Sequence, residues 1–551
     1  MPPVLVLRGG LVHGPTGGAV AADVAIEGDR IVAVTPAGRD AGARTDATWS
    51  AGAPRTAGAA EVLDVTGLHL APGFIDMHSH SDTAVIADPV NAAKTRQGIT
   101  LDLIGQDGLG VAPYDPDRDA GWRRSLLALT GHADLAWTWR SFAEHLAAVD
   151  AARPATNVAA LLAYGAARNA VMGLEARDPT APEMAGIEAV IDEAMRDGAF
   201  GVSVGLVYPP AVFAATDELV RAFSVVGRHG GLMVVHLRSQ GDEWLAAIDE
   251  AIDIARRAGV RLHVSHLCAL GARNWPGVPR ALARLAEARA AGLTVTFDQH
   301  PYTAASTTLS QVLPPWATEG GPERMGERLA DPAVRQAIRT EIEGRGRLGW
   351  ENYAGLAGWD RVQIAGATQP ANVPLLGRTL GAVARERGVD PVDLLADLLI
   401  SEAGSVPMVL LGMYDDASVL AIMTAPGGSI GTDGVIAPHP HPRLFGSTAR
   451  VLGHYVRDLG GLSVDQGVRR LATDGATILG LADRGVVAPG AFADLVAFDP
   501  ATIADRATYD DPQRHPDGIA HVLVNGRFVV RDGRETGERP GRVIRRGDGA
   551  S

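Results

Sequence analysis

The chain has 551 residues, 46% of them hydrophobic, and its 66 glycines and 34 prolines are too few for a collagen-like or low-complexity protein. Its length is sufficient for two to four globular domains with large cores. A formal net charge of −14 disfavours nucleic acid and anionic membranes as partners, because both bind mainly through lysine and arginine. We therefore expect a small-molecule substrate, and the composition leaves homo-oligomers open.

Two residue types occur only once. Cys268 has no partner for an internal disulfide, so an oxidising compartment offers this chain no advantage. The first residues lack the basic and apolar regions of a signal peptide, and no stretch approaches the roughly 18 apolar residues of a membrane span. We therefore expect a cytoplasmic protein. Lys94 is the only lysine, so a mechanism that needs a lysine has one candidate.

Short alternating segments at both ends of the chain predict β-strands. They are separated by glycine-containing turns and lie at 4–7, 24–27, 30–34, 493–498 and 521–530. We expect the two ends, residues 1–68 and 485–551, to pair into one small β-sandwich domain. The stretch 41–60 is predicted to be a loop, and the tail after Gly541 is predicted to be frayed.

Between these ends, short apolar runs alternate with helical stretches. The runs lie at 101–104, 200–204, 232–235, 262–264 and 293–297. Such alternation is typical of βα units with a parallel sheet, so the predicted fold class is α/β. A TIM-like (β/α)8 barrel over 69–484 is the economical arrangement. An insertion at about 314–373, which carries three tryptophans, interrupts it before the last strand and is a candidate lid.

Histidines follow several of the predicted strands. His78 and His80 end the first one, and residues two apart on a strand share a face, so both can reach one cation. His236 and His266 end two further apolar runs. Any one of them is more commonly a core histidine, but in a barrel the carboxyl ends of the strands form the active-site rim, where all four would converge. His263 is interpreted as structural.

Two carboxylates complete the candidate metal site. Asp433 ends a strand of small residues and can both ligate a metal and shuttle a proton. Asp107 closes the predicted second strand and can bridge two cations, although an aspartate before glycine is also typical of a simple turn. The candidate metal ligands are therefore His78, His80, Asp107, His236, His266 and Asp433.

The combination of motifs resembles the amidohydrolase superfamily, and more closely the N-acyl-D-amino-acid deacylase (D-aminoacylase) family. The resemblance covers nearly the whole chain. It rests on the opening sheet segments, the His-x-His of 72–80, and the motifs at 96–100, 201–208, 264–266, 298–303, 431–434, 441–443 and 524–526. It implies that His78, His80, His236, His266 and Asp433 form the metal and catalytic set, with one or two Zn²⁺ ions.

Three positions depart from the family pattern. Asp107 stands where the family has a bridging cysteine, and because a carboxylate is harder than a thiolate, divalent metals other than zinc become candidates. Leu267 and Cys268 follow the histidine of the sixth strand where the family often has a lysine, which removes a cationic contact to substrate. His300 stands in place of an aromatic residue.

The resemblance implies a metal-dependent hydrolase that cleaves the amide bond of N-acyl-D-amino acids to a carboxylate and a free amino acid. A divalent ion lowers the pKa of its bound water to about 7, so metal-bound hydroxide would attack while Asp433 shuttles the proton. Arg443, ten residues beyond Asp433, is a candidate for a two-pronged contact to the substrate carboxylate. Ser306, Tyr302 and His300 are further candidates for substrate binding.

Two alternatives remain. A cyclic-amide hydrolase of the hydantoinase or dihydroorotase type uses the same barrel but bridges two metals through a carboxylated lysine on a middle strand. Lys94 is instead predicted on a helix at 90–97, before the second strand. A non-catalytic protein with this fold is the other alternative, and the complete set of four histidines and Asp433 argues against it.

Overall fold

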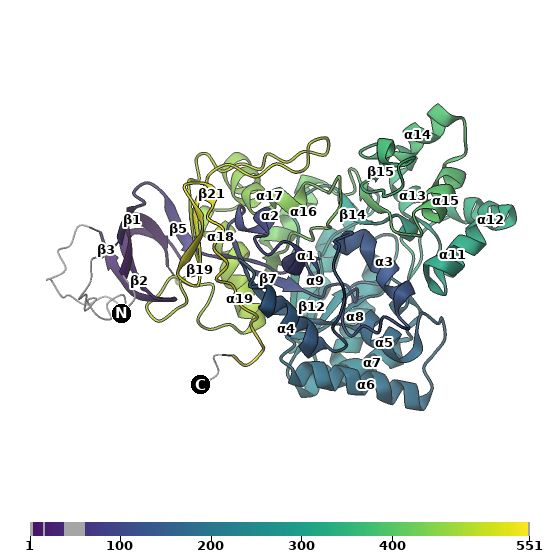
Figure 1. Cartoon of the computed structure of the whole chain (residues 1–551), viewed down its shortest axis with the longest axis horizontal. Helices are drawn as coiled ribbons and strands as arrows, with labels where there is room; N and C mark the ends of the chain where they lie inside the picture. The colour runs from purple at the N-terminus through teal and green to yellow at the C-terminus, as the bar shows by residue number, and fades with distance from the viewer. Residues whose placement is uncertain (1–3, 15–16, 38–60, 549–551) are drawn as a thin grey trace.

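The computed structural model describes residues 4–14, 17–37 and 61–548. Strands from both chain ends lie in one nine-stranded sheet, ordered β21-β20-β19-β18-β5-β1-β2-β3 with β4 beside β1 (Figure 1). They are β1 (Val4–His13), β2 (Ala19–Glu27), β3 (Arg30–Pro36), β4 (Glu61–Asp64), β5 (His69–Pro72), β18 (Leu495–Phe498), β19 (Ile519–Val524), β20 (Arg527–Arg531) and β21 (Arg534–Glu535). Antiparallel pairing of β18 with β5 joins the two ends. The loop predicted at 41–60 lies outside the described residues, and a two-layer sandwich stays a prediction.

The segment after Gly541 is packed, so the prediction of a frayed tail is wrong as far as residue 548. The amide of Gly541 donates to the carbonyl of Pro154 at 2.9 Å, and the amide of Ile544 donates to the carbonyl of Val158 at 2.8 Å. Val543 and Ile544 are buried. The rest of this tail is polar. Val543 and Ile544 bury their apolar side chains against the start of a central strand, which removes that apolar surface from water.

Parallel strands form the centre of the molecule. One sheet contains β6 (Phe74–Asp76), β7 (Ile99–Ile104) and β8 (Asn157–Ala160), and the other β9 (Leu162–Ala163), β10 (Gly201–Gly205), β11 (Leu232–His236), β12 (Arg261–Val264), β13 (Val295–Gln299) and β17 (Gly428–Ile430). Only Leu161 separates β8 from β9. The amide of Met77, after β6, donates to the carbonyl of Ile430 in β17 at 3.2 Å. The five apolar runs predicted as strands coincide with β7, β10, β11, β12 and β13.

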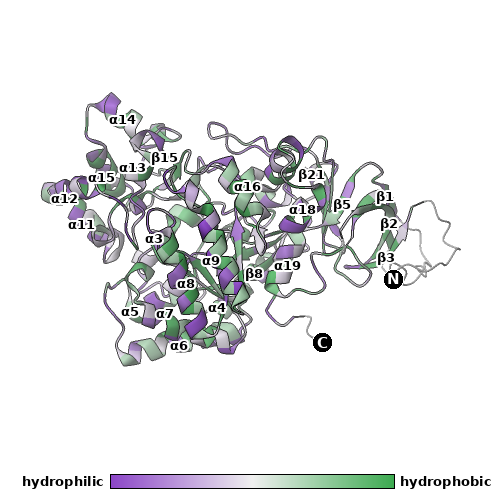
Figure 2. Ribbon diagram, turned by 180° about the vertical axis from the view of Figure 1, so that it is seen from behind, coloured by the Kyte–Doolittle hydropathy of each residue, from purple (hydrophilic) through white to green (hydrophobic). Residues whose placement is uncertain are grey.

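Amphipathic helices connect and cover these strands. The helices outside the long segment after β13 are α1 (Ala84–Ala87), α2 (Ala92–Thr95), α3 (Ala120–Thr130), α4 (Phe142–Ala152), α5 (Tyr164–Met172), α6 (Ala181–Arg196), α7 (Thr216–Arg228), α8 (Trp244–Ala258), α9 (Val278–Ala290), α17 (Arg443–Arg450), α18 (Val464–Val468) and α19 (Asp474–Leu479). In α7, Leu219, Ala222, Phe223 and Val226 recur every three or four residues and are buried. Figure 2 shows polar residues on the outer surfaces of α6 to α8.

A long segment, 300–427, separates β13 from β17. It contains a three-stranded sheet of β14 (Ala305–Thr308), β16 (Pro407–Leu410) and β15 (Val362–Ile364), with helices α10 (Pro315–Thr318), α11 (Gly321–Leu329), α12 (Pro332–Ile342), α13 (Tyr353–Ala357), α14 (Leu380–Arg387), α15 (Pro391–Ser401) and α16 (Asp416–Thr424). Figure 1 shows α11 to α15 projecting at the end of the molecule opposite the nine-stranded sheet. The insertion predicted at about 314–373 lies within this segment.

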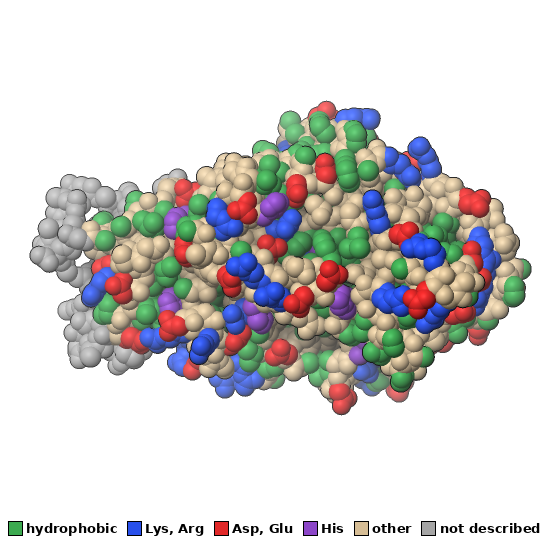
Figure 3. All heavy atoms as spheres, turned by 90° about the horizontal axis from the view of Figure 1, so that it is seen from above, with side chains coloured by type: hydrophobic (Ala, Val, Ile, Leu, Met, Phe, Trp, Pro, Cys, Tyr) green, Lys and Arg blue, Asp and Glu red, His purple; other side chains and the backbone are tan. Residues whose placement is uncertain are grey.

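The surface carries charges of both signs. On the face drawn in Figure 3, acidic and basic side chains are interspersed. Among the described helices, none combines the length and the apolar character that crossing a membrane requires.

Candidate active site

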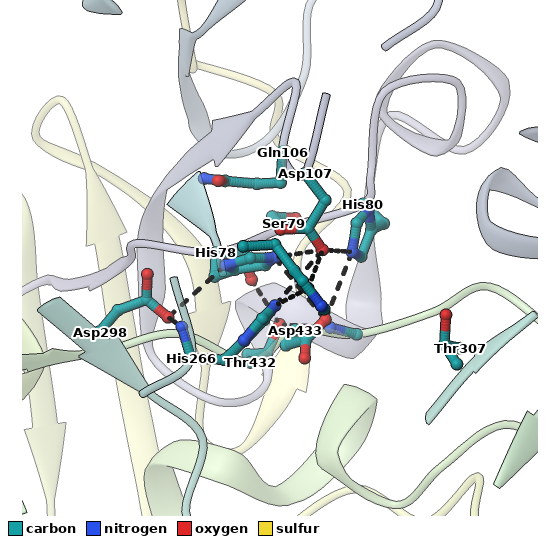
Figure 4. A network of polar contacts seen from close by, with 12 residues as sticks. His78, Ser79, His80, Gln106, Asp107, His266, Asp298, Thr307, Thr432 and Asp433 are labelled. Atoms are coloured by element: carbon teal, nitrogen blue, oxygen red, sulfur yellow. Dashed lines mark hydrogen bonds and ion pairs between the residues drawn. The ribbon is translucent and has the colours of Figure 1, made fainter. Parts of the chain in front are cut away.

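Six buried polar side chains gather at the carboxyl ends of the parallel strands (Figure 4). They are the six residues that the sequence predicted as metal ligands. Each follows or ends a strand: His78 and His80 after β6, Asp107 after β7, His236 at the end of β11, His266 after β12 and Asp433 after β17. Since these strand ends meet at one edge, residues more than 350 positions apart in the sequence come into contact.

The six side chains form two groups that share Asp107. In the first, candidate ligand atoms of His78, His80, Asp107 and Asp433 lie within 4.8 Å of one another, and in the second so do those of Asp107, His236 and His266. The Nε2 atom of His80 is 3.3 Å from Asp433 Oδ1. The Oδ2 atom of Asp107 is 3.5 Å from His78 Nε2 and 3.4 Å from His266 Nε2. A carboxylate common to both groups can bridge two cations.

Three of these residues have left-handed backbone conformations. The φ angles of Asp107, His266 and Asp433 are 55°, 31° and 49°. Such a conformation costs a non-glycine residue on the order of 1–3 kcal/mol, and it persists where the surroundings fix it. The amide of Asp433 donates to the carbonyl of His78 at 2.8 Å, which ties the end of β17 to the end of β6. These turns direct the three side chains towards the common centre.

The donor set fits a divalent cation. Several buried ring nitrogens and a carboxylate oxygen have no hydrogen-bond partner among the described residues, namely Nδ1 and Nε2 of His78, Nδ1 of His80, Nε2 of His236 and Oδ1 of Asp107. Each such buried atom costs about 1–3 kcal/mol when it stays unsatisfied. Imidazole nitrogens and carboxylate oxygens are ligands of zinc and related divalent ions. Of the ring nitrogens without a partner, Nε2 of His78 faces Asp107 and Asp433, so an ion bound at the cluster would satisfy it.

Both carboxylates of the cluster are held in the ionised form. Burial opposes ionisation of Asp107, but His78 and His266 hold its pKa well below the ordinary value. Burial also opposes ionisation of Asp433, and Arg443, followed by His78, keeps the pKa of that carboxyl low. An ionised carboxylate can bind a cation or accept a proton.

Asp298, in β13, is a site residue that the sequence analysis did not single out. Its Oδ1 atom lies 3.5 Å from His78 Nδ1 and accepts a hydrogen bond from the amide of His266 at 2.9 Å. Its Oδ2 atom lies 3.0 Å from Nε2 of His263, which is buried and belongs to neither group of candidate ligands. A carboxylate behind a candidate ligand histidine fixes the orientation of the ring. The signal was its position near the end of a predicted strand.

A small cavity of about 20 Å³ opens beside the cluster. Five of the six candidate ligands line it, and so do Arg443 and Ser306. Its remaining walls include uncharged side chains that the sequence analysis missed, namely Leu129, Tyr208, Leu270, Ala305, Tyr353 and Tyr414. Leu129 lies in α3, Tyr208 and Leu270 follow β10 and β12, and the other three come from the segment between β13 and β17. Of the six, only Tyr208 lies within a motif, the one at 201–208.

The predicted substrate-binding residues divide between two cavities. Arg443 and Ser306 line the cavity beside the cluster, whereas Tyr302 and His300 line a neighbouring one of about 10 Å³. The hydroxyl of Tyr302 donates to Asp505 Oδ2 at 3.2 Å. His266 and Tyr414 line both cavities. Tyr302 and His300 therefore line the neighbouring cavity and not the one beside the cluster.

Arg443 is buried beside the cluster. Its Nη1 atom is 2.9 Å from Asp433 Oδ2, and its Nη2 atom donates to the carbonyl of Ser306 at 3.0 Å. Its Nε atom has no partner among the described residues. The guanidinium thus holds one oxygen of Asp433 and keeps a free donor.

Comparison with protein families matches residues 61–530 to the model described as the amidohydrolase family. The chain belongs to this family. The D-aminoacylase of Alcaligenes xylosoxydans xylosoxydans is 34% identical to this amidohydrolase, over 98% of this chain and 97% of the relative.

Two solved structures resemble this amidohydrolase over almost the full length of each chain. One is a D-aminoacylase whose binuclear metal centre was studied, with a TM-score of 0.81 and 32% identity over 98% of this chain and 99% of that one. The other is the N-acyl-D-glutamate deacylase of Bordetella bronchiseptica in complex with zinc and a phosphonate inhibitor. Its TM-score is 0.81, with 31% identity over 99% of this chain and 100% of that one. The α/β fold is thus that of the D-aminoacylase structures.

Proposed function

We propose that this amidohydrolase cleaves the amide bond of N-acyl-D-amino acids and releases a carboxylate and a free amino acid. The observation that carries the proposal is the gathering of the metal-ligand candidates and Arg443 around one cavity. The D-aminoacylase and the N-acyl-D-glutamate deacylase described above resemble the chain from end to end, and both are named for substrates of this class.

His78, His80, Asp107, His236, His266 and Asp433 would hold one or two divalent ions, with zinc as the proposed ion. A divalent ion supplies two kinds of chemistry in such sites, because it lowers the pKa of water and polarises a carbonyl group. Asp107 offers a hard carboxylate oxygen at the shared position, so manganese or cobalt is also compatible with this donor set.

Asp433 would act as the general base and then as the general acid. Its Oδ2 is held by Arg443, while Oδ1 faces His80 at 3.3 Å, so Oδ1 is the atom placed to accept a proton from the attacking water. The same atom would return the proton to the leaving nitrogen when the C–N bond breaks. The low pKa of Asp433 keeps its carboxylate ionised before the proton is transferred.

Arg443 would bind the substrate carboxylate. Replacing it by methionine is expected to raise KM for an N-acyl amino acid by about 10- to 100-fold, because hydrogen bonds to a charged group contribute about 1.5–3 kcal/mol. Steady-state kinetics on N-acetyl-D-leucine measure the effect. An Arg443→Lys variant, which keeps the charge but not the planar fork, should recover part of the loss. An unchanged KM in Arg443→Met would contradict the assignment.

Removal of divalent ions should abolish hydrolysis and lower the melting temperature. A ligand that binds only the folded state stabilises it, by about 2.7 kcal/mol at 100 times its Kd. Calorimetry before and after treatment with a chelator measures the change, and added Zn²⁺ should restore both properties. A chelated protein with the same melting temperature and full activity would show that the cluster binds no functional ion.

The cyclic-amide alternative requires a lysine beside the metals. Lys94 is buried on α2, and its amine contacts Asp76 and donates to Thr432 Oγ1 at 2.7 Å and to Ser79 Oγ at 3.1 Å. None of these partners is a candidate metal ligand, and they already engage the amine. We therefore favour a linear amide as substrate over a hydantoin or dihydroorotate.

We further propose that the eight parallel strand segments, counting β8 and β9 as one, close into a (β/α)8 barrel over 69–484. Hydrogen bonds between the ends of β6 and β17 support closure. Residues 1–68 and 485–551 would form the β-sandwich domain. The shared sheet supports the pairing of the two ends, and it extends to β5, just beyond residue 68.

One experiment separates the three functions. It combines metal analysis of the purified protein with an activity panel of N-acetyl-D- and N-acetyl-L-amino acids, dipeptides ending in a D-residue, and hydantoins. We expect bound metal and hydrolysis of the N-acetyl-D-amino acids. Hydrolysis of hydantoins alone would favour the cyclic-amide alternative, and a metal-free, inactive protein would favour a non-catalytic role.

A further inference from the structure

The cavity beside the cluster has an uncharged wall. Leu129, Leu270 and Ala305 contribute aliphatic surface, and Tyr208, Tyr353 and Tyr414 contribute aromatic surface. All six are buried in the folded chain. A wall of this kind stabilises an apolar ligand group by removing it from water, at about 25 cal/mol per Å² of apolar surface.

Among the described residues, Arg443 is the only arginine or lysine that lines this cavity. Two of its nitrogens already contact Asp433 and Ser306. The remaining capacity of the guanidinium matches one substrate carboxylate, which every N-acyl amino acid carries. A second carboxylate, on the substrate side chain, has no second arginine or lysine to pair with among the residues that line this cavity.

The groups directly behind the wall add no positive charge. Cys268 is buried and carries no basic group. Burial, and then Arg443, lowers the pKa of His300 well below its ordinary value, so that ring is neutral. Glu351 is acidic and accepts hydrogen bonds from the amides of Gln240 and Gly241 at 2.5 and 3.0 Å. An acidic substrate side chain therefore finds no counter-charge here.

We propose that this amidohydrolase selects N-acyl-D-amino acids with uncharged, apolar side chains and rejects those of glutamate and aspartate. The inference rests on the proposed function and narrows its substrate class. A carboxylate that enters a buried cavity loses its hydration, and without a counter-charge no electrostatic interaction compensates for that loss. Overall similarity does not make this distinction, because a D-aminoacylase and an N-acyl-D-glutamate deacylase resemble the chain to the same extent.

The test compares kcat/KM for five substrates with one preparation of metal-loaded enzyme: N-acetyl-D-leucine, -methionine, -phenylalanine, -glutamate and -aspartate. We expect the three neutral compounds to exceed the two acidic ones by at least about 100-fold. Equal or faster hydrolysis of the acidic compounds would overturn the inference and leave the proposed function standing. Hydrolysis of none of the five would overturn the proposed function, and the inference with it.

A gain-of-function variant tests whether the uncharged wall of this cavity determines the selectivity against acidic substrates. Leu270→Lys adds a cation to the cavity wall and should shift the ratio of glutamate to leucine activity towards glutamate by at least about 10-fold. Val389→Lys adds the same charge at a side chain that is 44% exposed and should leave the ratio unchanged. An unchanged ratio in folded, metal-loaded Leu270→Lys would overturn the assignment of this wall. The panel on the unmodified enzyme decides the selectivity even if the variant does not fold.

Discussion

Asp433→Asn is expected to lower kcat by about 10²- to 10⁴-fold, the range that a general acid–base contributes. Asparagine has the same size and keeps an oxygen in the position of Oδ1, 3.3 Å from His80. It cannot accept the proton of the attacking water, and it leaves Arg443 without its ionised partner. Most of the metal should stay bound, because the histidines and Asp107 remain.

The measurement combines kcat on N-acetyl-D-leucine with metal content by elemental analysis. Asp253→Asn is a matched control, since that side chain is 51% exposed on the outer helix α8. Turnover like that of the unmodified enzyme would remove Asp433 from the mechanism. Loss of both metal and turnover would make it a ligand without a separate catalytic role.

Lys94→Met is expected to lower the free energy of unfolding by about 3–5 kcal/mol, the cost of leaving a buried charge without its partner. The Lys94 amine contacts the buried Asp76, and it lies 3.8 Å from Oδ1 of the buried Asp102. Burial raises the pKa of Asp102 to about 6, and Lys94 opposes that rise. Without the amine, two buried carboxylates would face each other.

The contacts of Lys94 and Asp76 also extend to the active site. Asp76 accepts hydrogen bonds from the amide and the hydroxyl of Thr432, both at 2.7 Å, so it connects β6 to the turn that carries Asp433. Urea unfolding measures the loss in Lys94→Met, and Arg469→Met, at a side chain that is 71% exposed, is the control. A double variant, Lys94→Met with Asp76→Asn, should recover part of the stability. A loss below about 1 kcal/mol would show that the pair contributes little net stability.

The strand positions and the ligand cluster could be predicted because each depends on a local pattern. Apolar runs of three to five residues predicted the strands, and the polar residues at strand ends placed His78, Asp107 and Asp433 on one rim. The cavity walls could not be predicted in this way. Tyr353 and Tyr414 come from the segment after β13, whose path depends on contacts distant in sequence.

The positions of two segments could not be predicted from the local sequence pattern. Tyr302 and His300 lie close to Ser306 in the sequence, yet they line the neighbouring cavity, because the chain turns between β13 and β14. The tail after Gly541 is polar in composition, but two apolar residues are enough to dock it on β8. Composition averaged over a segment hides such pairs.

The burial of the single lysine has a practical consequence. Succinimidyl esters and aldehyde crosslinkers react with side-chain amines, and this protein's only such amine is enclosed between β6 and the turn after β17. In the folded state, these reagents find no lysine at the surface. Acylation of Lys94 would therefore follow opening of the core, and its rate, read by mass spectrometry of the peptide around Lys94, would report how often the native structure opens there.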